Sequence, residues 1–165
     1  MPSGRLVRGT RGSALARTQT GWVRSELLRL HPGLDVAIEI VETRGDTSTA
    51  PLWDAAGDGV FTRELEEALG AGRIDAAVHS LKDLPTALPE GLVLGAVPRR
   101  ADPRDALVGL RRADLRAGVR VGTGSLRRAA QLLAHVPGLV VEPLRGNVDT
   151  RLRKLDEGRH DAIVL

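Results

Sequence analysis

The sequence predicts an α/β protein with mainly parallel strands, and three features of the chain support this fold class. First, short apolar runs typical of buried strands alternate with longer segments whose apolar residues recur at helical spacing. Second, several turns that lead from a strand to a helix contain a glycine beside a residue that commonly caps helices. Third, hydrophobic residues make up 42% of the 165 residues and charged residues 27%, which is usual for globular proteins. We therefore expect two domains, each a doubly wound sheet that is mixed but mainly parallel.

The first half of the chain begins with a predicted strand at 6–9, followed by a long helix at 14–30. The helix is predicted because Trp22, Val23 and Leu27 recur at helical spacing, and His-Pro-Gly at 31–33 ends it. After it come apolar runs that we expect to be strands and one amphipathic segment, closed by glycines, that we expect to be a helix. The predicted strands are at 36–41, 74–79 and 92–97, and the helix is at 61–69.

The segment 99–105 is predicted to be a hinge between two domains, because it is polar, contains proline and interrupts the apolar pattern. The first domain is expected at 1–98 and the second at 106–165. The second has strands predicted at 106–108, 119–121, 139–142 and 162–165, a short helix near Ala113, and helices at 125–134 and 147–155. Since the chain stops inside the last strand, we expect it to be the front part of a longer protein with its second domain truncated.

Composition excludes several classes of protein. Without cysteine, this chain has no thiol nucleophile, cysteine-ligated metal or disulfide. Nearly all basic residues are arginine, yet 21 acidic residues offset the 24 basic ones, and the net charge of +3 is too small for a typical nucleic-acid binder. No segment has the apolar length of a signal peptide or membrane span. We expect a cytoplasmic protein without nucleic-acid or membrane partners. His31, His135 and His160 are expected to be solvated, and no spacing predicts a metal site.

Anion-binding groups are expected where predicted strands lead into helices, since ligands of open α/β sheets bind at the carboxyl ends of the strands. Turns at 11–13, 122–128 and 145–151 each combine a glycine, a hydroxyl or amide residue and an arginine. Free backbone N–H groups and a guanidinium suit a carboxylate or phosphate. Any one of these turns is more simply a helix cap. Their recurrence predicts a ligand with several anionic groups, while dinucleotide and Walker motifs are not matched.

The strongest candidate for a chemical role is Asp83, which follows the predicted strand at 74–79 and precedes a proline-containing turn. Its carboxylate could face a pocket and stabilise a developing cation, although a turn-capping role is the simpler alternative. Lys82 is a rare lysine in this arginine-rich chain, which suggests that a compact ammonium is needed there. A hydrolase triad of His79, Ser80 and Asp83 is disfavoured, because neighbours on a strand point to opposite faces.

Several stretches of the sequence carry a family resemblance. They are Arg11-Gly-Ser-Ala-Leu-Ala, Thr43-Arg-Gly-Asp, Gly59-Val-Phe-Thr-Arg-Glu-Leu-Glu, Asp75-Ala-Ala-Val-His-Ser-Leu-Lys-Asp-Leu-Pro, Asp102-Pro-Arg-Asp-Ala, Gly122-Thr-Gly-Ser-Leu-Arg-Arg and Leu144-Arg-Gly-Asn-Val-Asp-Thr-Arg-Leu-Arg-Lys-Leu-Asp. In this order they resemble porphobilinogen deaminase, also called hydroxymethylbilane synthase. The resemblance spans nearly the whole chain but only about the first half of a family member.

The resemblance implies a transferase of heme and other tetrapyrrole biosynthesis, which joins four porphobilinogen molecules into hydroxymethylbilane and releases ammonia at each addition. It implies that Asp83 is the catalytic carboxylate, which assists loss of the amine and stabilises positive charge on the pyrrole nitrogens. The cofactor-binding residues that it implies are Lys82, Asp83, Ser125, Arg127 and Arg128. The implied substrate-binding residues are Arg11, Ser13, Phe61, Thr123, Arg145 and Arg151, with Phe61 in a lid loop. It also implies a monomer with lobes like those of solute-binding proteins.

Three departures from the family pattern qualify this expectation. The family carries a dipyrromethane cofactor on a cysteine of a third domain, and both that cysteine and that domain are absent from this chain. Asp58 stands where members often have lysine in the glycine-rich loop. Gly124 replaces a more usual serine, which removes a hydroxyl while preserving the turn. Two alternatives therefore stay open: a non-catalytic anion-binding module, or an inactive fragment without its cofactor-bearing domain.

Overall fold

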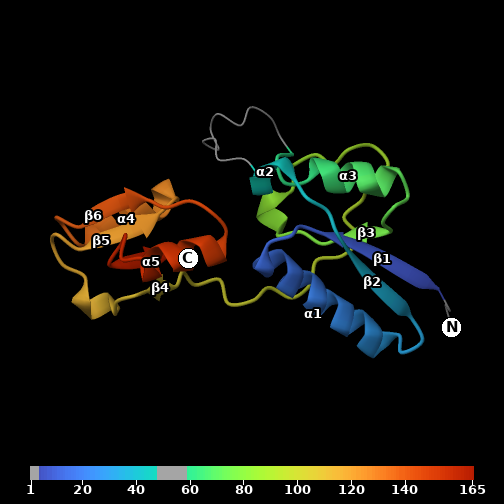
Figure 1. Cartoon of the computed structure of the whole chain (residues 1–165), viewed down its shortest axis with the longest axis horizontal. Helices are drawn as coiled ribbons and strands as arrows, with labels where there is room; N and C mark the ends of the chain where they lie inside the picture. Colours follow the sequence, from blue (N-terminus) through green and yellow to red (C-terminus); the bar gives the residue numbers. More distant parts are fainter. Residues whose placement is uncertain (1–3, 48–58) are drawn as a thin grey trace. The chain divides into compact units, whose positions relative to one another are not determined.

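The computed structural model describes residues 4–47 and 59–165 of the chain. The chain divides into two compact units, Met1–Val97 and Pro98–Leu165. Each unit contains its own β-sheet with helices beside it (Figure 1). Within the described ranges, no helix combines the length and the apolar character that crossing a membrane requires.

The first unit is built on a three-stranded sheet in the order β2-β1-β3. In chain order its elements are β1 (Arg5–Thr10), α1 (Ala14–Leu30), β2 (Asp35–Ile40), α2 (Arg44–Thr47), α3 (Arg63–Gly70), β3 (Ala76–Ala77) and the 3-10 helix η1 (Leu81–Asp83). Both strand pairings are parallel, as the sequence predicts. Parallel strands place their carboxyl ends at the same edge of the sheet, so the turns after β1 and β3 lie close together.

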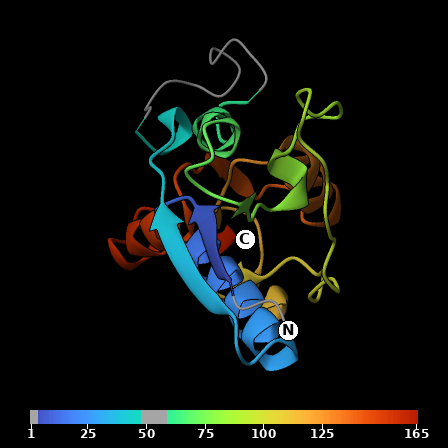
Figure 2. The same cartoon turned by 90° about the vertical axis from the view of Figure 1, so that its right-hand side faces the viewer.

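Helices α1 and α3 cover opposite faces of this sheet (Figures 1 and 2). The hydroxyl of Thr20 on α1 donates a hydrogen bond to the hydroxyl of Thr10 on β1 at 2.8 Å. The preceding residue, Gly9, faces α3 instead, because a Cβ added there would lie only 2.7 Å from the side chain of Leu65. Neighbouring residues on a strand point to opposite faces, which fixes the two helices on the two sides. The α3 side holds the buried core Val41, Leu65, Ala68 and Ile74.

Two predicted strands of the first unit differ from the structure. Of residues 74–79, only Ala76 and Ala77 join the sheet. The predicted strand at 92–97 is wrong: its residues form no strand, and Val93 is 86% exposed. An apolar run becomes a strand only where a neighbour pairs its backbone N–H and C=O groups, and no strand in the described part of the chain does so here.

The second unit contains a four-stranded sheet in the order β4-β7-β5-β6. Its elements are β4 (Leu107–Val108), the 3-10 helix η2 (Arg112–Asp114), β5 (Arg120–Thr123), α4 (Leu126–His135), β6 (Val140–Pro143), α5 (Val148–Asp156) and β7 (Ala162–Val164). Each was predicted to within one or two residues. The pairings β5–β6 and β5–β7 are parallel, whereas β4 runs antiparallel to β7, so the sheet is mixed as expected.

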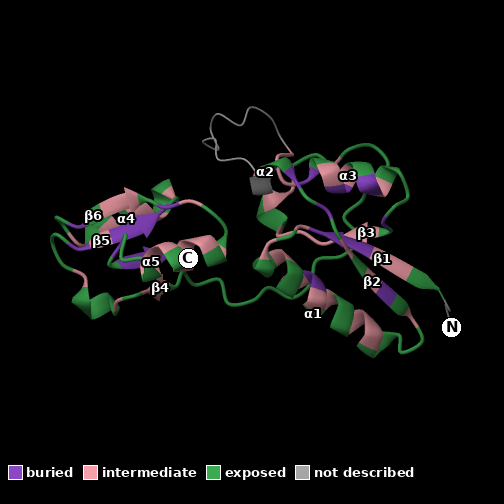
Figure 3. Ribbon diagram, in the orientation of Figure 1, coloured by how far each residue is buried: buried purple, intermediate pink, exposed green. Residues whose placement is uncertain are grey.

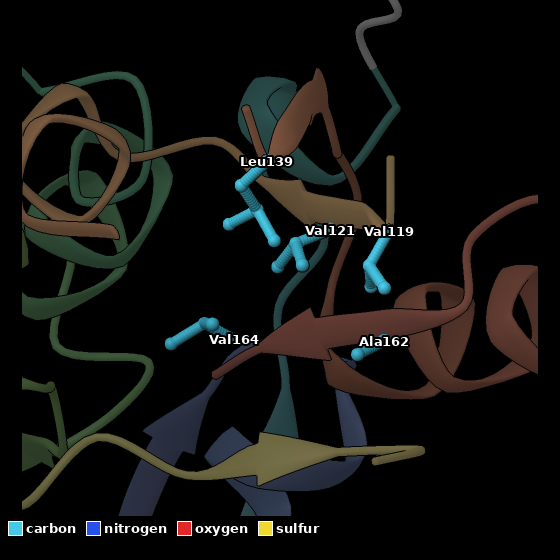
Figure 4. Packing of buried hydrophobic residues seen from close by; sticks show 5 residues of the cluster. All are labelled: Val119, Val121, Leu139, Ala162 and Val164. Carbon is cyan, nitrogen blue, oxygen red and sulfur yellow. The ribbon is translucent and has the colours of Figure 1, made fainter. Parts of the chain in front are cut away.

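Burial in the second unit is concentrated on β5 and β7 (Figure 3). Five side chains from these strands and the segments beside them gather into one cluster (Figure 4): Val119, Val121, Leu139, Ala162 and Val164. The cluster packs β5 and β7 together with the residue that precedes β6. Because β5 and β6 are parallel and in register from Arg120 with Val140 to Thr123 with Pro143, both helices begin at the same edge of the sheet.

Candidate functional site

In the first unit, the turns after β1 and β3 bring together a carboxylate, a guanidinium and an aromatic ring. The Nη1 atom of Arg11, which follows β1, lies 3.7 Å from Oδ2 of Asp83 in η1, and their side chains are 16% and 20% exposed. The guanidinium carbon of Arg11 lies 4.1 Å from the centre of the Phe61 ring, which precedes α3. The largely desolvated carboxylate of Asp83 is therefore paired with the guanidinium of Arg11, which in turn packs on the ring of Phe61.

His79, the last residue of the 74–79 segment, and Ser80, which follows it, face different neighbours. The hydroxyl of Ser80 donates a hydrogen bond to Oε1 of Gln19 on α1 at 3.0 Å. Ser80 therefore does not donate to His79, as the serine of a hydrolase triad would. His79 lies instead within electrostatic range of Asp83, Arg11 and Glu66. Burial lowers the pKa of His79 from its ordinary value, the positive charge of Arg11 lowers it further, and the two carboxylates oppose the shift in part.

The lowered pKa of His79 has a consequence for stability. We expect the first unit to lose stability as the pH falls below about 6.5, because the unfolded chain then binds a proton that folded His79 rejects. At higher pH the imidazole is neutral in both states and contributes no pH dependence. Thermal unfolding at about pH 7.5 and 5.5, followed by tryptophan fluorescence, measures the loss. Trp22 lies on α1 of the first unit, and the sequence of the second unit contains no tryptophan.

The matched variants are His79→Gln and His31→Gln. His31 is exposed at the end of α1, so its replacement should leave the pH dependence unchanged. His79→Gln should reduce the loss of stability between the two pH values. If His79→Gln and the unmodified chain lose the same stability, the half-buried imidazole of His79 is not the titrating group.

Two further predicted residues of the first unit have plain structural positions. Ser13 is the N-cap of α1, and its Oγ accepts a hydrogen bond from the backbone N–H of Ala16 at 3.3 Å. Its own hydroxyl proton is thus left to donate to another group. Lys82 lies in η1 next to Asp83 and is exposed.

In the second unit, the predicted cap residues lie at one edge of the sheet, at the starts of α4 and α5. Ser125 Oγ accepts from the backbone N–H of Arg128 at 3.4 Å, and Asn147 Oδ1 accepts from that of Thr150 at 3.0 Å. Buried Thr123, at the end of β5, accepts a hydrogen bond from the backbone N–H of Ser125 at 3.2 Å. Capping by Ser125 and Asn147 is compatible with anion binding at the same helix ends. The other backbone N–H groups of the first turns of α4 and α5 point out of the same edge of the sheet.

The predicted arginines gather near these helix ends. Arg128 is 21% exposed and donates from Nη1 to the backbone carbonyl of Val164 at 3.3 Å. Arg151, in the first turn of α5, donates from Nε to the carbonyl of Gly146 at 2.7 Å. Burial lowers the pKa of Arg151, and the like charge of Arg128 adds to the effect. Arg127 is more exposed, and Arg145 is half-buried. The result is a local excess of positive charge.

Glycine is required at the turn between β5 and α4. A Cβ at Gly124 would lie 2.7 Å from the carbonyl oxygen of Leu144, so the serine usual in the resembling family would need a backbone shift here. A Cβ at Gly122 would lie 2.9 Å from the ring of His160. Asp58, the other noted departure, lies outside the described residues.

His160 corrects one prediction and shows what the sequence could not reveal. It was expected to be solvated, yet it is 8% exposed, and its Nδ1 lies 2.7 Å from Oε2 of Glu142. The strand order β7-β5-β6 explains this, since His160 precedes β7 and reaches across β5 to Glu142 on β6. Asp105, which contacts Arg127 and Arg128, was also not singled out as a site residue. Its only signal was its place in the Asp-Pro-Arg-Asp stretch.

Comparisons with known proteins agree on one family. Residues 6–165 match the family model described as "Porphobilinogen deaminase, dipyromethane cofactor binding domain". A curated protein of Roseiflexus sp. (strain RS-1), named porphobilinogen deaminase, is 59% identical over 164 residues, covering 97% of this chain and 54% of the relative. Proteins of the same name from Syntrophobacter fumaroxidans and Gloeobacter violaceus are 51% and 54% identical, with 98% and 97% of this chain covered. The chain spans about half the length of the curated relatives it matches.

Proposed function

Because the chain belongs to the porphobilinogen deaminase family, we propose that it supplies the catalytic carboxylate and the carboxylate-binding groups of an enzyme that polymerises porphobilinogen into hydroxymethylbilane. The reaction releases ammonia at each addition and belongs to tetrapyrrole biosynthesis. The proposal concerns the full-length protein, since this chain matches only about half of its relatives. We also propose that the full-length protein is a cytoplasmic monomer, with lobes arranged like those of solute-binding proteins.

The observation that carries the proposal is the ion pair between Asp83 and Arg11. A carboxylate whose side chain is only 20% exposed is held 3.7 Å from a guanidinium, at the edge where β1 and β3 end. Such a group can accept hydrogen bonds from N–H donors and counter positive charge more strongly than a fully hydrated carboxylate. Loss of an amine from an aminomethylpyrrole needs that assistance.

The chemistry assigned to Asp83 follows from where charge develops. The bond between the aminomethyl carbon and its nitrogen breaks, the electron pair leaves with the protonated amine as ammonia, and positive charge spreads onto the pyrrole nitrogen. We propose that Asp83 accepts the hydrogen bond of this pyrrole N–H and counters the charge, while Arg11 fixes the orientation of the carboxylate. The ring of Phe61 packs on the guanidinium of Arg11 and limits its movement.

The residues of the second unit fit a ligand that bears several carboxylates. Each pyrrole of the family's dipyrromethane carries an acetate and a propionate, and arginine grips a carboxylate through two parallel hydrogen bonds. We propose that Arg127, Arg128 and Ser125 hold such side chains of the cofactor. Of the cofactor-binding residues in the first unit, Lys82 is proposed to bind a cofactor carboxylate, whereas Asp83 accepts hydrogen bonds from pyrrole N–H groups. We assign substrate carboxylates to Arg11, Ser13, Thr123, Arg145 and Arg151, with Phe61 beside Arg11. When bound, the dipyrromethane supplies the primer to which the first substrate is joined.

Ammonia release by the full-length protein tests this function. We expect about one ammonia for each porphobilinogen consumed, with hydroxymethylbilane as the first product. A non-catalytic anion-binding module would bind porphobilinogen without releasing ammonia, and this result would exclude the proposed reaction. The 165-residue chain alone, which lacks cysteine, is expected to give no turnover.

A further inference from the structure

Asp105 lies between the guanidinium groups of two predicted ligand-binding arginines. Its Oδ1 is 2.9 Å from Nη2 of Arg128, and its Oδ2 is 3.3 Å from Nη2 of Arg127. Both contacts are hydrogen bonds as well as ion pairs. Asp105 precedes β4, whereas the arginines open α4, so the contact joins segments 22 and 23 residues apart. One carboxylate thus bridges two neighbouring cations that otherwise repel each other.

The orientation of the two arginines depends on few other contacts. The remaining hydrogen bond of Arg128 goes from Nη1 to the carbonyl of Val164 at 3.3 Å, and its Nε is buried without an acceptor. Among the residues that the structure describes, the one other side chain hydrogen-bonded to Arg127 is Gln131 on the next turn of α4, at 3.1 Å. In the described part of the chain, Asp105 is the one carboxylate within ion-pair distance of either arginine. Without it, both long side chains would regain rotamer freedom.

Charge at this edge still favours an anionic ligand after Asp105 is counted. Arg127, Arg128 and Arg151 contribute three positive charges near the starts of α4 and α5, and Asp105 and Asp149 offset two of them. The guanidinium of Arg128 lowers the pKa of Asp105, chiefly through its hydrogen bond, so the carboxylate stays charged in the neutral range. The bridge therefore orders the arginines without cancelling the positive excess that a carboxylate-bearing ligand needs.

We propose that Asp105 is a positioning residue, which pre-orients the guanidinium groups of Arg127 and Arg128 for the carboxylates of the pyrrole cofactor. The inference rests on the proposed function of this site. A positioning role and a simple charge effect predict opposite changes in ligand affinity when Asp105 is neutralised. Removing a negative charge beside an anion site should by itself strengthen binding. Loss of pre-orientation should weaken binding instead, because the ligand must then order both side chains.

The test compares Asp105→Asn with Asp102→Asn in the full-length protein. The two variants remove the same charge from the same segment, but Asp102 pairs with Arg104 and touches neither site arginine. Cofactor-free protein is mixed with porphobilinogen, and mass spectrometry follows the rate at which the covalent pyrrole adduct appears. We expect Asp105→Asn to lower this rate at least about tenfold, from the loss of charge-assisted hydrogen bonds. Asp102→Asn should stay within about twofold of the unmodified protein.

A third variant, Asp105→Glu, retains the charge and should restore most of the rate, which a merely steric role of Asp105 would not predict. Equal or faster adduct formation in Asp105→Asn overturns the positioning role while leaving the proposed function intact. Failure of the unmodified protein to form any adduct instead contradicts the proposed function, and the positioning role with it. Thermal unfolding midpoints of all variants should agree within a few degrees, since Asp105 is a partly exposed surface residue whose replacement leaves the core intact.

Discussion

Replacing Asp83 by asparagine in the full-length protein is expected to lower kcat for porphobilinogen by at least about 100-fold. Asparagine keeps the size of the side chain and an acceptor oxygen but removes the negative charge that counters the developing cation. It also replaces the carboxylate that lies 3.7 Å from Nη1 of Arg11 by a neutral amide. Steady-state formation of hydroxymethylbilane measures kcat, and the thermal unfolding midpoint shows whether the variant is folded.

The matched control for this experiment is Asp35→Asn. Asp35 starts β2 in the same unit and also pairs with an arginine, but its side chain is 73% exposed. Surface ion pairs contribute little, so kcat and stability should both stay near those of the unmodified protein. If folded Asp83→Asn retains kcat within about threefold, Asp83 is not the group that stabilises the cation.

Replacing Arg8 by methionine is expected to stabilise the first unit by about 2 kcal/mol, although Arg8 is one of the most buried residues of the chain. Its side chain lies on the α1 side of β1 and is 1% exposed, and among residues 4–47 and 59–165 none offers a hydrogen-bond acceptor to any of its three guanidinium nitrogens. Burial lowers the pKa of Arg8, and the like charge of Arg24 on α1 adds to this effect. Methionine fills a similar volume without the cost of an unpaired buried charge.

A gain of this size corresponds to a rise of roughly 10 °C in the unfolding midpoint of a unit of this length. Tryptophan fluorescence of the 165-residue chain reports it, since the sequence of the second unit contains no tryptophan. Arg5→Met is the matched control on the same strand, because Arg5 is 69% exposed and its replacement should have little effect. A lower midpoint for Arg8→Met would show that the guanidinium has a stabilising contact that the structure does not contain.

Local signals predicted the helices well. Helix α1 begins and ends where the sequence predicts, because Ser13 offers a capping oxygen and His-Pro-Gly at 31–33 cannot continue the helix. The starts of α4 and α5 were predicted equally well, from Ser125 and Asn147. In each case a residue within one turn of the boundary carries the information.

Features that depend on distant parts of the chain could not be predicted in the same way. The apolar run at 92–97 has the composition of a strand but lacks a described neighbour to pair with. The burial of His160 against Glu142 can be predicted only when the strand order is known, because β5 lies between β7 and β6. The bridge from Asp105 to Arg128 spans 23 residues, and no local pattern encodes it.

The candidate site shows the same division. Position after a strand is the signal by which the sequence singles out Asp83 and the three turns that we propose bind anions, since the carboxyl ends of parallel strands share one edge. The sequence did not predict that Arg11 would pair with Asp83 or that Phe61 would pack on Arg11. These contacts join three segments that only the fold of the first unit brings together.

The central claim is that the Asp83 carboxylate faces the pyrrole nitrogens on which positive charge develops. A crystal structure of the full-length protein with its dipyrromethane attached measures this directly. We predict that the carboxylate oxygens of Asp83 lie within about 3.2 Å of pyrrole nitrogen atoms, with Arg11 still beside the carboxylate. Pyrrole nitrogens more than about 5 Å from Asp83, with no water between them, would contradict the claim.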